Sequence, residues 1–306
     1  ITLSHLTQRL NMSMNTPNEI KKYQKRINSL LDRAVPPSNN NARLNDAMRY
    51  AVISGGKRIR PLLIYSSGLC FDIQLNKLDI PAVSIELLHA FSLVHDDLPS
   101  MDDDDLRRGL PTTHKKFSEA TAILAADALQ TLSFELIANS ESLDDYEKIK
   151  LVSLIAKACG SSGMTGGQSI DLASEGKTLS KSELHEMHAM KTGALIHASI
   201  MAPFCMMNNP NQDIQTMMSE FAWTLGLAFQ IRDDLLDIEQ PSEVLGKTAN
   251  SDIKNNKATW PAIFGVKESH SYCDKLLKKC IQHLEYFDHK ADTLRWLTNY
   301  LINRKH

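Results

Sequence analysis

The chain contains 306 residues, of which 42% are apolar and 23% are charged, and its formal net charge is −2. This length and apolar content allow a sizeable core in one large domain or two small ones. Nucleic-acid partners favour strongly basic domains, so the balanced charge indicates no nucleic-acid partner.

The cysteines and the N-terminus indicate where the protein works. Five cysteines are scattered, odd in number and without a CxxC pair, which is typical of reduced thiols in a cytoplasmic protein. No uninterrupted apolar run reaches the roughly 18 residues of a membrane span, and no signal-peptide segment is visible. We therefore expect a cytoplasmic protein without a membrane partner. Ile1 is not an initiator, so we expect residues 1–17 to be a disordered or non-native tail ahead of one domain at residues 18–306.

Apolar residues recur at i, i+3, i+4 and i+7 along most of the chain, which is the pattern of amphipathic helices. In the first predicted helix, Glu19–Ala34, the side chains of Ile20, Tyr23 and Ile27 share one face, and Pro36 follows its end. No repeat, linker or domain boundary is visible, so we expect an all-α, single-domain helical bundle. Further helices are expected at Leu44–Ser54, Leu62–Phe71, Ile80–His95, Ser118–Ala138, Tyr146–Cys159, Ser180–Met207, Ile214–Ile238, Ala258–Ser269, Tyr272–Phe287 and Leu294–Arg304.

A basic turn, GGKRIRP at Gly55–Pro61, interrupts the helical pattern. Its glycines permit a tight turn from which Lys57 and Arg60 can direct cationic groups at one spot. The alternative is a helix C-cap with ordinary surface charges. His89, on the helix Ile80–His95, is either a satisfied core residue or a phosphate ligand.

An acidic run, HDDLPSMDDDDLRRG, follows the helix Ile80–His95 and places six aspartates between positions 96 and 105. Their mutual repulsion needs open water or bound cations, and Mg2+ prefers oxygen ligands. Arg107 and Arg108 follow at once, and arginine suits bidentate phosphate contacts. Asp96 and Asp102 are six residues apart, so the helix must end or loosen between them. A solvated acidic loop is the alternative.

A polar interruption marks the predicted helix Ser180–Met207, which begins with a Ser180–Glu183 capping pattern. Lys191, Thr192 and a glycine break its apolar course, and such breaks often mark functional sites. Upstream, the polar pair Gln168 and Asp171 either contributes to a metal shell or caps a helix, and we favour the cap.

A second acidic cluster, FQIRDDLLD, ends the helix Ile214–Ile238, where Asp233 and Asp237 share a face at i and i+4. A polar loop, Gln240–Asn256, follows. The sequence contains no Ser–His–Asp set, CxxC metal site or Walker glycine loop. Two acidic clusters and placed cations therefore indicate metal-assisted chemistry on diphosphates in a helical pocket with apolar walls.

These motifs resemble those of the trans-isoprenyl diphosphate synthases. HDDLPSMDDDDLRRG resembles their first aspartate-rich motif, GGKRIRP their basic turn and DDLLD their second aspartate motif. The likeness spans nearly the whole chain from Ile20, and Leu98 and Pro99 match the longer first motif of bacterial farnesyl diphosphate synthases. The resemblance implies an all-helical homodimer with a deep central cavity in each subunit. It also implies condensation of isopentenyl diphosphate with dimethylallyl and geranyl diphosphates to farnesyl diphosphate.

The resemblance implies roles for the matching residues. Three Mg2+ ions, with Mn2+ able to substitute, would be held by Asp96, Asp97, Asp102, Asp233, Asp234 and Asp237. Isopentenyl diphosphate would be bound by Lys57, Arg60, His89 and Arg108. The allylic diphosphate would be bound by Arg107, Lys191, Thr192, Gln230, Lys247 and Lys257. Of these, Lys191, Thr192 and Gln230 would also be catalytic, because they stabilise the leaving diphosphate or the allylic cation.

Phe91 and Ser92 are the candidates for control of product length. They lie five and four residues before Asp96, or about 6–7.5 Å along a helix. A ring at that depth would block the growing prenyl tail, and similar farnesyl synthases carry an aromatic residue at the position of Phe91. Core packing of Phe91 is the alternative.

Three other functions are alternatives to farnesyl diphosphate synthesis. A geranylgeranyl or longer-chain synthase shares all of the motifs. A terpene cyclase shares the fold, but its second metal motif normally mixes Asn or Asp, Ser or Thr, and Glu. A non-catalytic prenyl-diphosphate-binding subunit should have lost an aspartate motif, and both are intact here.

Overall fold

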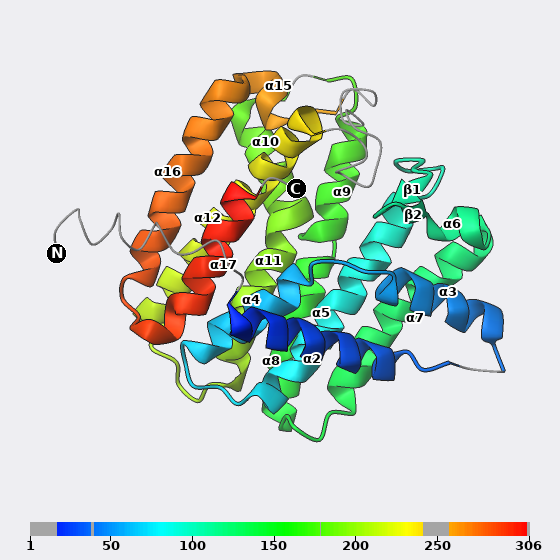
Figure 1. Ribbon diagram of the computed structural model, residues 1–306, viewed down its shortest axis with the longest axis horizontal. Helices are drawn as coiled ribbons and strands as arrows, with labels where there is room; N and C mark the ends of the chain where they lie inside the picture. Colours follow the sequence, from blue (N-terminus) through cyan, green and yellow to red (C-terminus); the bar gives the residue numbers. More distant parts are fainter. Residues whose placement is uncertain (1–16, 38–39, 178, 241–256, 305–306) are drawn as a thin grey trace.

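The computed structural model describes residues 17–37, 40–177, 179–240 and 257–304, and helices dominate them (Figure 1). This confirms the expected all-α, single-domain fold. The strands among these residues form one short antiparallel hairpin, β1 (Leu106–Arg107) and β2 (Leu110–Pro111). The helices are α2 (Asn18–Ala34), α3 (Ala42–Ile53), α4 (Ile59–Leu69), α5 (Leu75–Asp96), α6 (Thr113–Lys116), α7 (Glu119–Ala138), α8 (Asp145–Cys159), α9 (Met164–Ala173), α10 (Lys181–His188), η1 (Ala189–Gly193), α11 (Ala194–Met201), η2 (Ala202–Met206), α12 (Gln212–Glu239), α15 (Trp260–Phe264), α16 (Val266–Leu284), η3 (His289–Ala291) and α17 (Asp292–Asn303).

The apolar periodicity places the helix faces correctly. Ile20, Tyr23 and Ile27 of α2 are all buried, as predicted. The capping box of Ser180 and Glu183 at the start of α10 is present, because each side chain accepts a hydrogen bond from the other residue's backbone N–H. The expected tail at residues 1–17 lies outside the described residues except for Pro17.

The break expected between Ser269 and Tyr272 is wrong, because α16 runs through it without interruption. The chain breaks earlier, at Gly265, whose φ of +86° ends α15. Ser269 is fully buried and donates a hydrogen bond to the Gly265 carbonyl oxygen at 2.7 Å. Its polar side chain therefore bonds within the helix instead of ending it.

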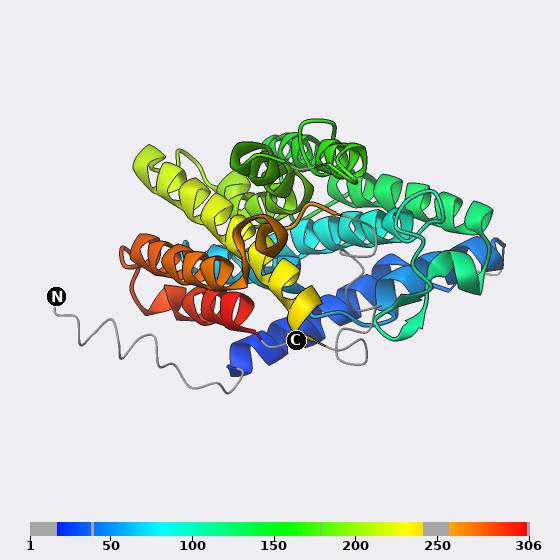
Figure 2. The same ribbon diagram turned by 90° about the horizontal axis from the view of Figure 1, so that it is seen from above.

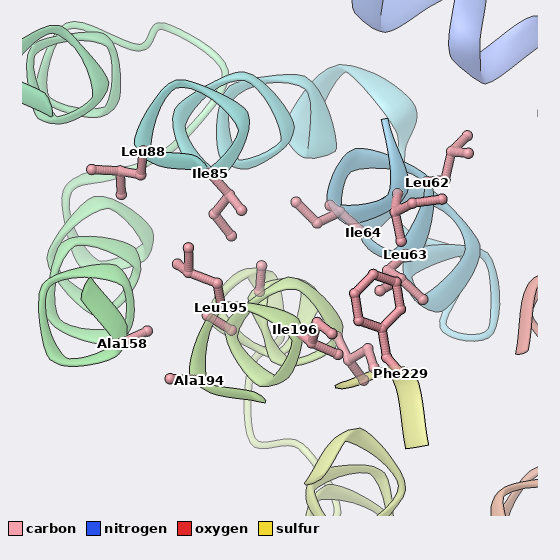
Figure 3. Packing of buried hydrophobic residues seen from close by; sticks show 14 of the residues in the cluster. Leu62, Leu63, Ile64, Ile85, Leu88, Ala158, Ala194, Leu195, Ile196 and Phe229 are labelled. Atoms are coloured by element: carbon pink, nitrogen blue, oxygen red, sulfur yellow. The ribbon is translucent and has the colours of Figure 1, made fainter. Parts of the chain in front are cut away.

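The core gathers around α5, which is buried on nearly all sides and lies between α4, α7 and α11. Figure 3 shows Leu63 of α4, Ile85 and Leu88 of α5, Leu195 of α11 and Phe229 of α12 around one interior. A helix that is apolar all round belongs inside a bundle. From above, α2 and α17 lie on one side of α5, and α7 and α8 lie on the other (Figure 2).

Two helices, α5 and α7, are long and apolar enough to cross a membrane by length and composition alone. The window in α5 is 67% buried, as expected for a core helix of a globular bundle, and the window in α7 is 33% buried. The absence of a membrane partner stays a prediction. All five cysteines are free thiols, and only Cys70 is not fully buried.

Candidate active site

The first aspartate motif is shaped by the end of α5. The helix ends at Asp96, as the six-residue spacing required, and the chain turns so that the Asp102 N–H donates to the Asp96 carbonyl oxygen at 2.9 Å. The hairpin β1–β2 then returns Arg107, whose Nε donates to Asp97 Oδ1 at 2.9 Å. The hairpin was not predicted, because each strand has only two residues.

The carboxylates of this motif are crowded. Burial raises the pKa of Asp96 to about 6, and the charge of Asp102 adds to the rise. Burial also raises the pKa of Asp97 to about 6, although the Arg107 guanidinium opposes it. Additional positive charge at this end of α5 would therefore favour the ionised carboxylates.

Lys191 and Thr192 project from a π-helix, η1, which lies where polar residues interrupt the apolar pattern of the predicted helix Ser180–Met207. Single π-turns inside α-helices are frequent at functional sites. Two glycines permit neighbouring helices to touch this turn. A Cβ on Gly167 of α9 would lie 2.1 Å from the Lys191 nitrogen, and a Cβ on Gly226 of α12 would lie 2.9 Å from the Gly193 Cα.

Asp171 links two of the predicted diphosphate ligands. It is buried near the C-terminal end of α9 and accepts a hydrogen bond from Lys191 Nζ at 2.5 Å, and Lys257 Nζ lies at 3.9 Å. Lys257 also donates to Asp102 at 2.8 Å. Burial would raise the pKa of Asp171, but Lys191 and Lys257 together lower it. Burial would likewise lower the pKa of Lys191, but Asp171, with the first motif, raises it.

The preferred interpretation of Gln168 and Asp171 as a helix cap is wrong. Both lie within α9, which ends at Ala173 and has Ser174 as its C-cap residue. Gln168 is 9% exposed, and neither polar atom of its amide has a hydrogen-bond partner among the described residues.

The second aspartate motif splits into residues with different partners. Asp233, whose side chain is 45% exposed, pairs with Arg304 beyond the end of α17. Asp234 is 3% exposed and accepts hydrogen bonds from Gln230 Nε2 at 2.8 Å and from the Trp260 backbone nitrogen at 2.9 Å. Asp237 is buried on the same helix and remains a predicted metal ligand.

Thr192 and Gln230, predicted to act together, are in contact: Thr192 Oγ1 donates to Gln230 Oε1 at 2.5 Å. Lys191 interacts electrostatically with the first aspartate motif, and Thr192 hydrogen-bonds to Gln230 beside the second. Two consecutive residues of one π-turn therefore connect the two motifs. Lys247, the remaining predicted ligand of the allylic diphosphate, lies outside the described residues.

The predicted isopentenyl diphosphate ligands form one cationic region. Arg60 is buried, so it is not an ordinary surface charge, and its Nε has no hydrogen-bond partner among the described residues. Burial, with Arg60 and Arg108 nearby, holds the pKa of His89 well below its usual range. Burial lowers the pKa of Lys57, Arg304 lowers it further and Asp233 opposes the fall. The guanidinium of Arg108 bonds to the Gly55 carbonyl.

Arg304 was missed by the sequence reasoning. Its guanidinium contacts Asp233 and lies 4.2 Å from the centre of the Phe229 ring. Its backbone oxygen accepts from Arg232 Nε at 2.8 Å, which ties the end of α17 to α12. The only available signal was a basic residue near the C-terminus, with no motif around it.

Mg2+ would fit these carboxylates if the lysine and arginine side chains that bind them moved away. Among the described residues, no group of three His, Cys, Asp or Glu side chains is close enough to hold a metal. The carboxylates instead bind cationic side chains: Arg107 on Asp97, Lys257 on Asp102 and Arg304 on Asp233. Carboxylate oxygens are the hard ligands that Mg2+ prefers, and the raised pKa of Asp96 shows that extra positive charge is favourable there.

A helical bundle that directs two aspartate motifs and a set of lysines and arginines at one region defines a class of diphosphate-directed enzymes. The polyprenyl synthetase family model matches residues 41–298, and the chain belongs to this family. It is 39% identical over 297 residues to the farnesyl diphosphate synthase of Escherichia coli K12, covering 95% of this chain and 99% of that one. Identity to the Haemophilus influenzae farnesyl diphosphate synthase is 40%, with 94% and 98% covered.

Solved structures agree with this assignment. A geranyltransferase from Legionella pneumophila superimposes with a TM-score of 0.83 at 34% identity, over 94% of this chain and 96% of that one. A geranyltransferase from Helicobacter pylori, complexed with magnesium and isoprenyl diphosphate, gives 0.84 at 31% identity, over 95% and 98%. The fold and the family therefore rest on nearly the whole chain.

Proposed function

We propose that the chain is a Mg2+-dependent prenyltransferase that condenses isopentenyl diphosphate with dimethylallyl and geranyl diphosphates, releasing diphosphate and giving farnesyl diphosphate. One observation carries the proposal: Lys191 and Lys257 both lie at Asp171, and Lys257 also binds Asp102 of the first aspartate motif. Thr192, adjacent to Lys191, hydrogen-bonds to Gln230, beside the second motif. The farnesyl diphosphate synthases among the relatives support the choice of reaction.

The side chains divide the work between two diphosphates. Lys191, Arg107 and Lys257 hold the allylic diphosphate once the lysines and arginine exchange their carboxylate partners for phosphate oxygens. The aspartates would hold Mg2+, which would supply positive charge to stabilise the leaving diphosphate. Three ions and replacement by Mn2+ stay predictions.

In this proposal, Thr192 and Gln230 stabilise the allylic carbocation. Because Thr192 donates its proton to Gln230 Oε1, its hydroxyl oxygen keeps its lone pairs for a positive centre. Apolar walls keep water from that centre. The isopentenyl diphosphate, bound by Lys57, Arg60, His89 and Arg108, attacks through C4 and then loses a proton, which the released diphosphate accepts.

The runner-up is a geranylgeranyl diphosphate synthase, because such an enzyme from Arabidopsis thaliana is 39% identical over 287 residues, or 92% of this chain. Incubation of the purified protein with Mg2+, isopentenyl diphosphate and each allylic primer separates the two when the products are chromatographed. A dominant C15 product supports the proposal, and C20 supports the runner-up. Loss of all product in EDTA, restored by Mg2+, tests the metal requirement.

We also propose that the enzyme is a cytoplasmic homodimer. Large apolar side chains are exposed on neighbouring helices: Ile123 and Leu124 of α7 at 43% and 58%, and Ile149 of α8 at 68%. Exposed large apolar side chains on neighbouring helices suit a two-fold interface. Light scattering should give twice the chain mass, and Leu124→Glu should give monomers. A wild-type monomer at micromolar concentration would contradict the proposal.

A further inference from the structure

We propose that Asp234 is a positioning residue that fixes the amide of Gln230, in contrast to its neighbour Asp233, which is available to metal. The inference rests on the proposed function and deepens it. The two aspartates are adjacent in sequence but differ in exposure, with side chains 3% and 45% exposed. They therefore face different surroundings, and a shared motif does not give them a shared role.

Each carboxylate oxygen of Asp234 already accepts a hydrogen bond from a specific donor. Gln230, one turn earlier in α12, donates Nε2 to Oδ1 at 2.8 Å. The Trp260 backbone N–H donates to Oδ2 at 2.9 Å, and His188 Nε2 lies 3.8 Å from the same oxygen. Turning the carboxylate toward a metal would leave a buried backbone N–H unpaired, which proteins avoid.

The Trp260 donor is itself held rigidly. Its ring is 2% exposed, stacks on Tyr272 with centroids 5.3 Å apart and planes 6° apart, and lies 4.9 Å from the Phe264 ring. Lys181 Nζ lies 5.2 Å from the Tyr272 centroid. The start of α15 is thereby fixed, and Asp234 is fixed to it.

The chemical consequence falls on Gln230. The two ends of a glutamine amide have nearly the same shape, and only their partners decide which way they point. A carboxylate can only accept, so Asp234 selects the NH2 end of Gln230. The carbonyl end then faces Thr192 Oγ1 at 2.5 Å and must accept its proton. Asp234 therefore determines the direction in which the Thr192 hydroxyl donates its hydrogen bond, without touching substrate.

The first test compares Asp234→Asn with the matched neighbour Asp233→Asn. Asparagine has nearly the shape of aspartate, but its side chain has only one acceptor oxygen. The two donors, Gln230 Nε2 and the Trp260 N–H, each need an acceptor. We expect kcat to fall about 10- to 150-fold, the usual effect of one lost hydrogen bond to a charged group. The Mg2+ concentration for half-maximal rate should stay within about twofold, whereas Asp233→Asn should raise it at least about tenfold. An equal rise in both variants would overturn the inference.

A double-mutant cycle tests whether Asp234 acts through Gln230. In a Gln230→Leu background the amide is absent, so adding Asp234→Asn should lower kcat by no more than about threefold. A full additional loss of about tenfold or more would show that Asp234 acts by another route.

A third measurement needs neither metal nor turnover. In protein labelled with 15N-glutamine, the side-chain NH2 signal of Gln230 is assigned by its loss in Gln230→Leu. This signal should shift and lose its protection from hydrogen exchange in Asp234→Asn but not in Asp233→Asn. An unchanged signal in Asp234→Asn overturns the inference. If the wild-type protein makes no prenyl product, the proposed function fails, yet this signal still decides what Asp234 does.

Discussion

Replacing Phe91 by alanine should lengthen the product. Phe91 lies five residues before Asp96, or about 7.5 Å along α5 at 1.5 Å per residue. It is 8% exposed, and its ring meets the ring of His95 edge-on with centroids 4.8 Å apart. If this ring forms the floor of the cavity, its removal opens space for one more five-carbon unit, and the product should shift from C15 toward C20.

The same change should cost stability. Removal of a packed phenylalanine ring typically costs about 3–5 kcal/mol, of which an aromatic pair such as Phe91–His95 accounts for about 0.5–1.5 kcal/mol. Phe91→Leu retains more of the bulk and serves as the second variant if Phe91→Ala does not fold. Urea unfolding measures the stability, and chromatography of products from geranyl diphosphate with excess isopentenyl diphosphate measures the chain length.

Ser92 provides the opposite perturbation. It lies at i and i+4 with Asp96, on the same face of α5, and its hydroxyl donates to the His89 carbonyl at 2.9 Å. Ser92→Phe should therefore shorten the product to C10, while Ser92→Ala should leave it at C15.

A folded Phe91→Ala enzyme that still stopped at C15 would refute the assignment of the floor and leave Phe91 as core packing.

Arg60→Ala should mainly raise KM for isopentenyl diphosphate, and Lys191→Ala should mainly impair binding and reaction of the allylic substrate, each by about 10- to 150-fold. Steady-state kinetics with each substrate varied measures both effects. Equal effects of both variants on both substrates would count against two separate diphosphate sites. Gly226→Ala should destabilise the fold by about 1–3 kcal/mol in urea unfolding, because its Cβ would lie 2.9 Å from the Gly193 Cα; unchanged stability would mean that the two helices separate freely. Burial, with a smaller effect of Lys157, lowers the pKa of His197 to about 4. The folded state therefore binds fewer protons than the unfolded state, and stability should fall as the pH drops from about 6.5 toward 4, by up to about 1.4 kcal/mol per pH unit. His197→Gln should flatten this pH dependence in urea unfolding, and identical slopes would remove His197 as its source.

The sequence predicted the helices because their apolar faces follow from the 3.6-residue period alone. It missed the hairpin around Arg107, whose strands are too short to show a period of two. It also misplaced the break near α16, where the Ser269 hydroxyl donates to the Gly265 carbonyl oxygen and the helix continues. Periodicity reports which side of a helix is buried, but not which polar groups find partners within it.

The sequence predicted which residues form the candidate site, but it did not predict which of their side chains contact one another. Thr192 and Gln230 were both expected in the site, but their hydrogen bond across 38 residues of sequence was not. Asp171 was undervalued because its partner Lys191 comes from a different helix. Arg304 contacts Asp233 from 71 residues away. Such pairings depend on how helices pack against one another, and a single sequence carries no direct record of that packing.

The π-turn η1 has a consequence for how the protein tolerates changes of length. A π-turn holds one residue more than an α-turn. Deleting one residue within Ala189–Gly193 would let α10 continue into α11 as a regular α-helix, and the remaining residues of this turn would lose the positions that the extra residue gives them. Lys191 and Thr192 could then no longer reach both aspartate motifs together. A single-residue deletion at this point would therefore separate catalysis from folding, while composition and hydropathy stay almost unchanged.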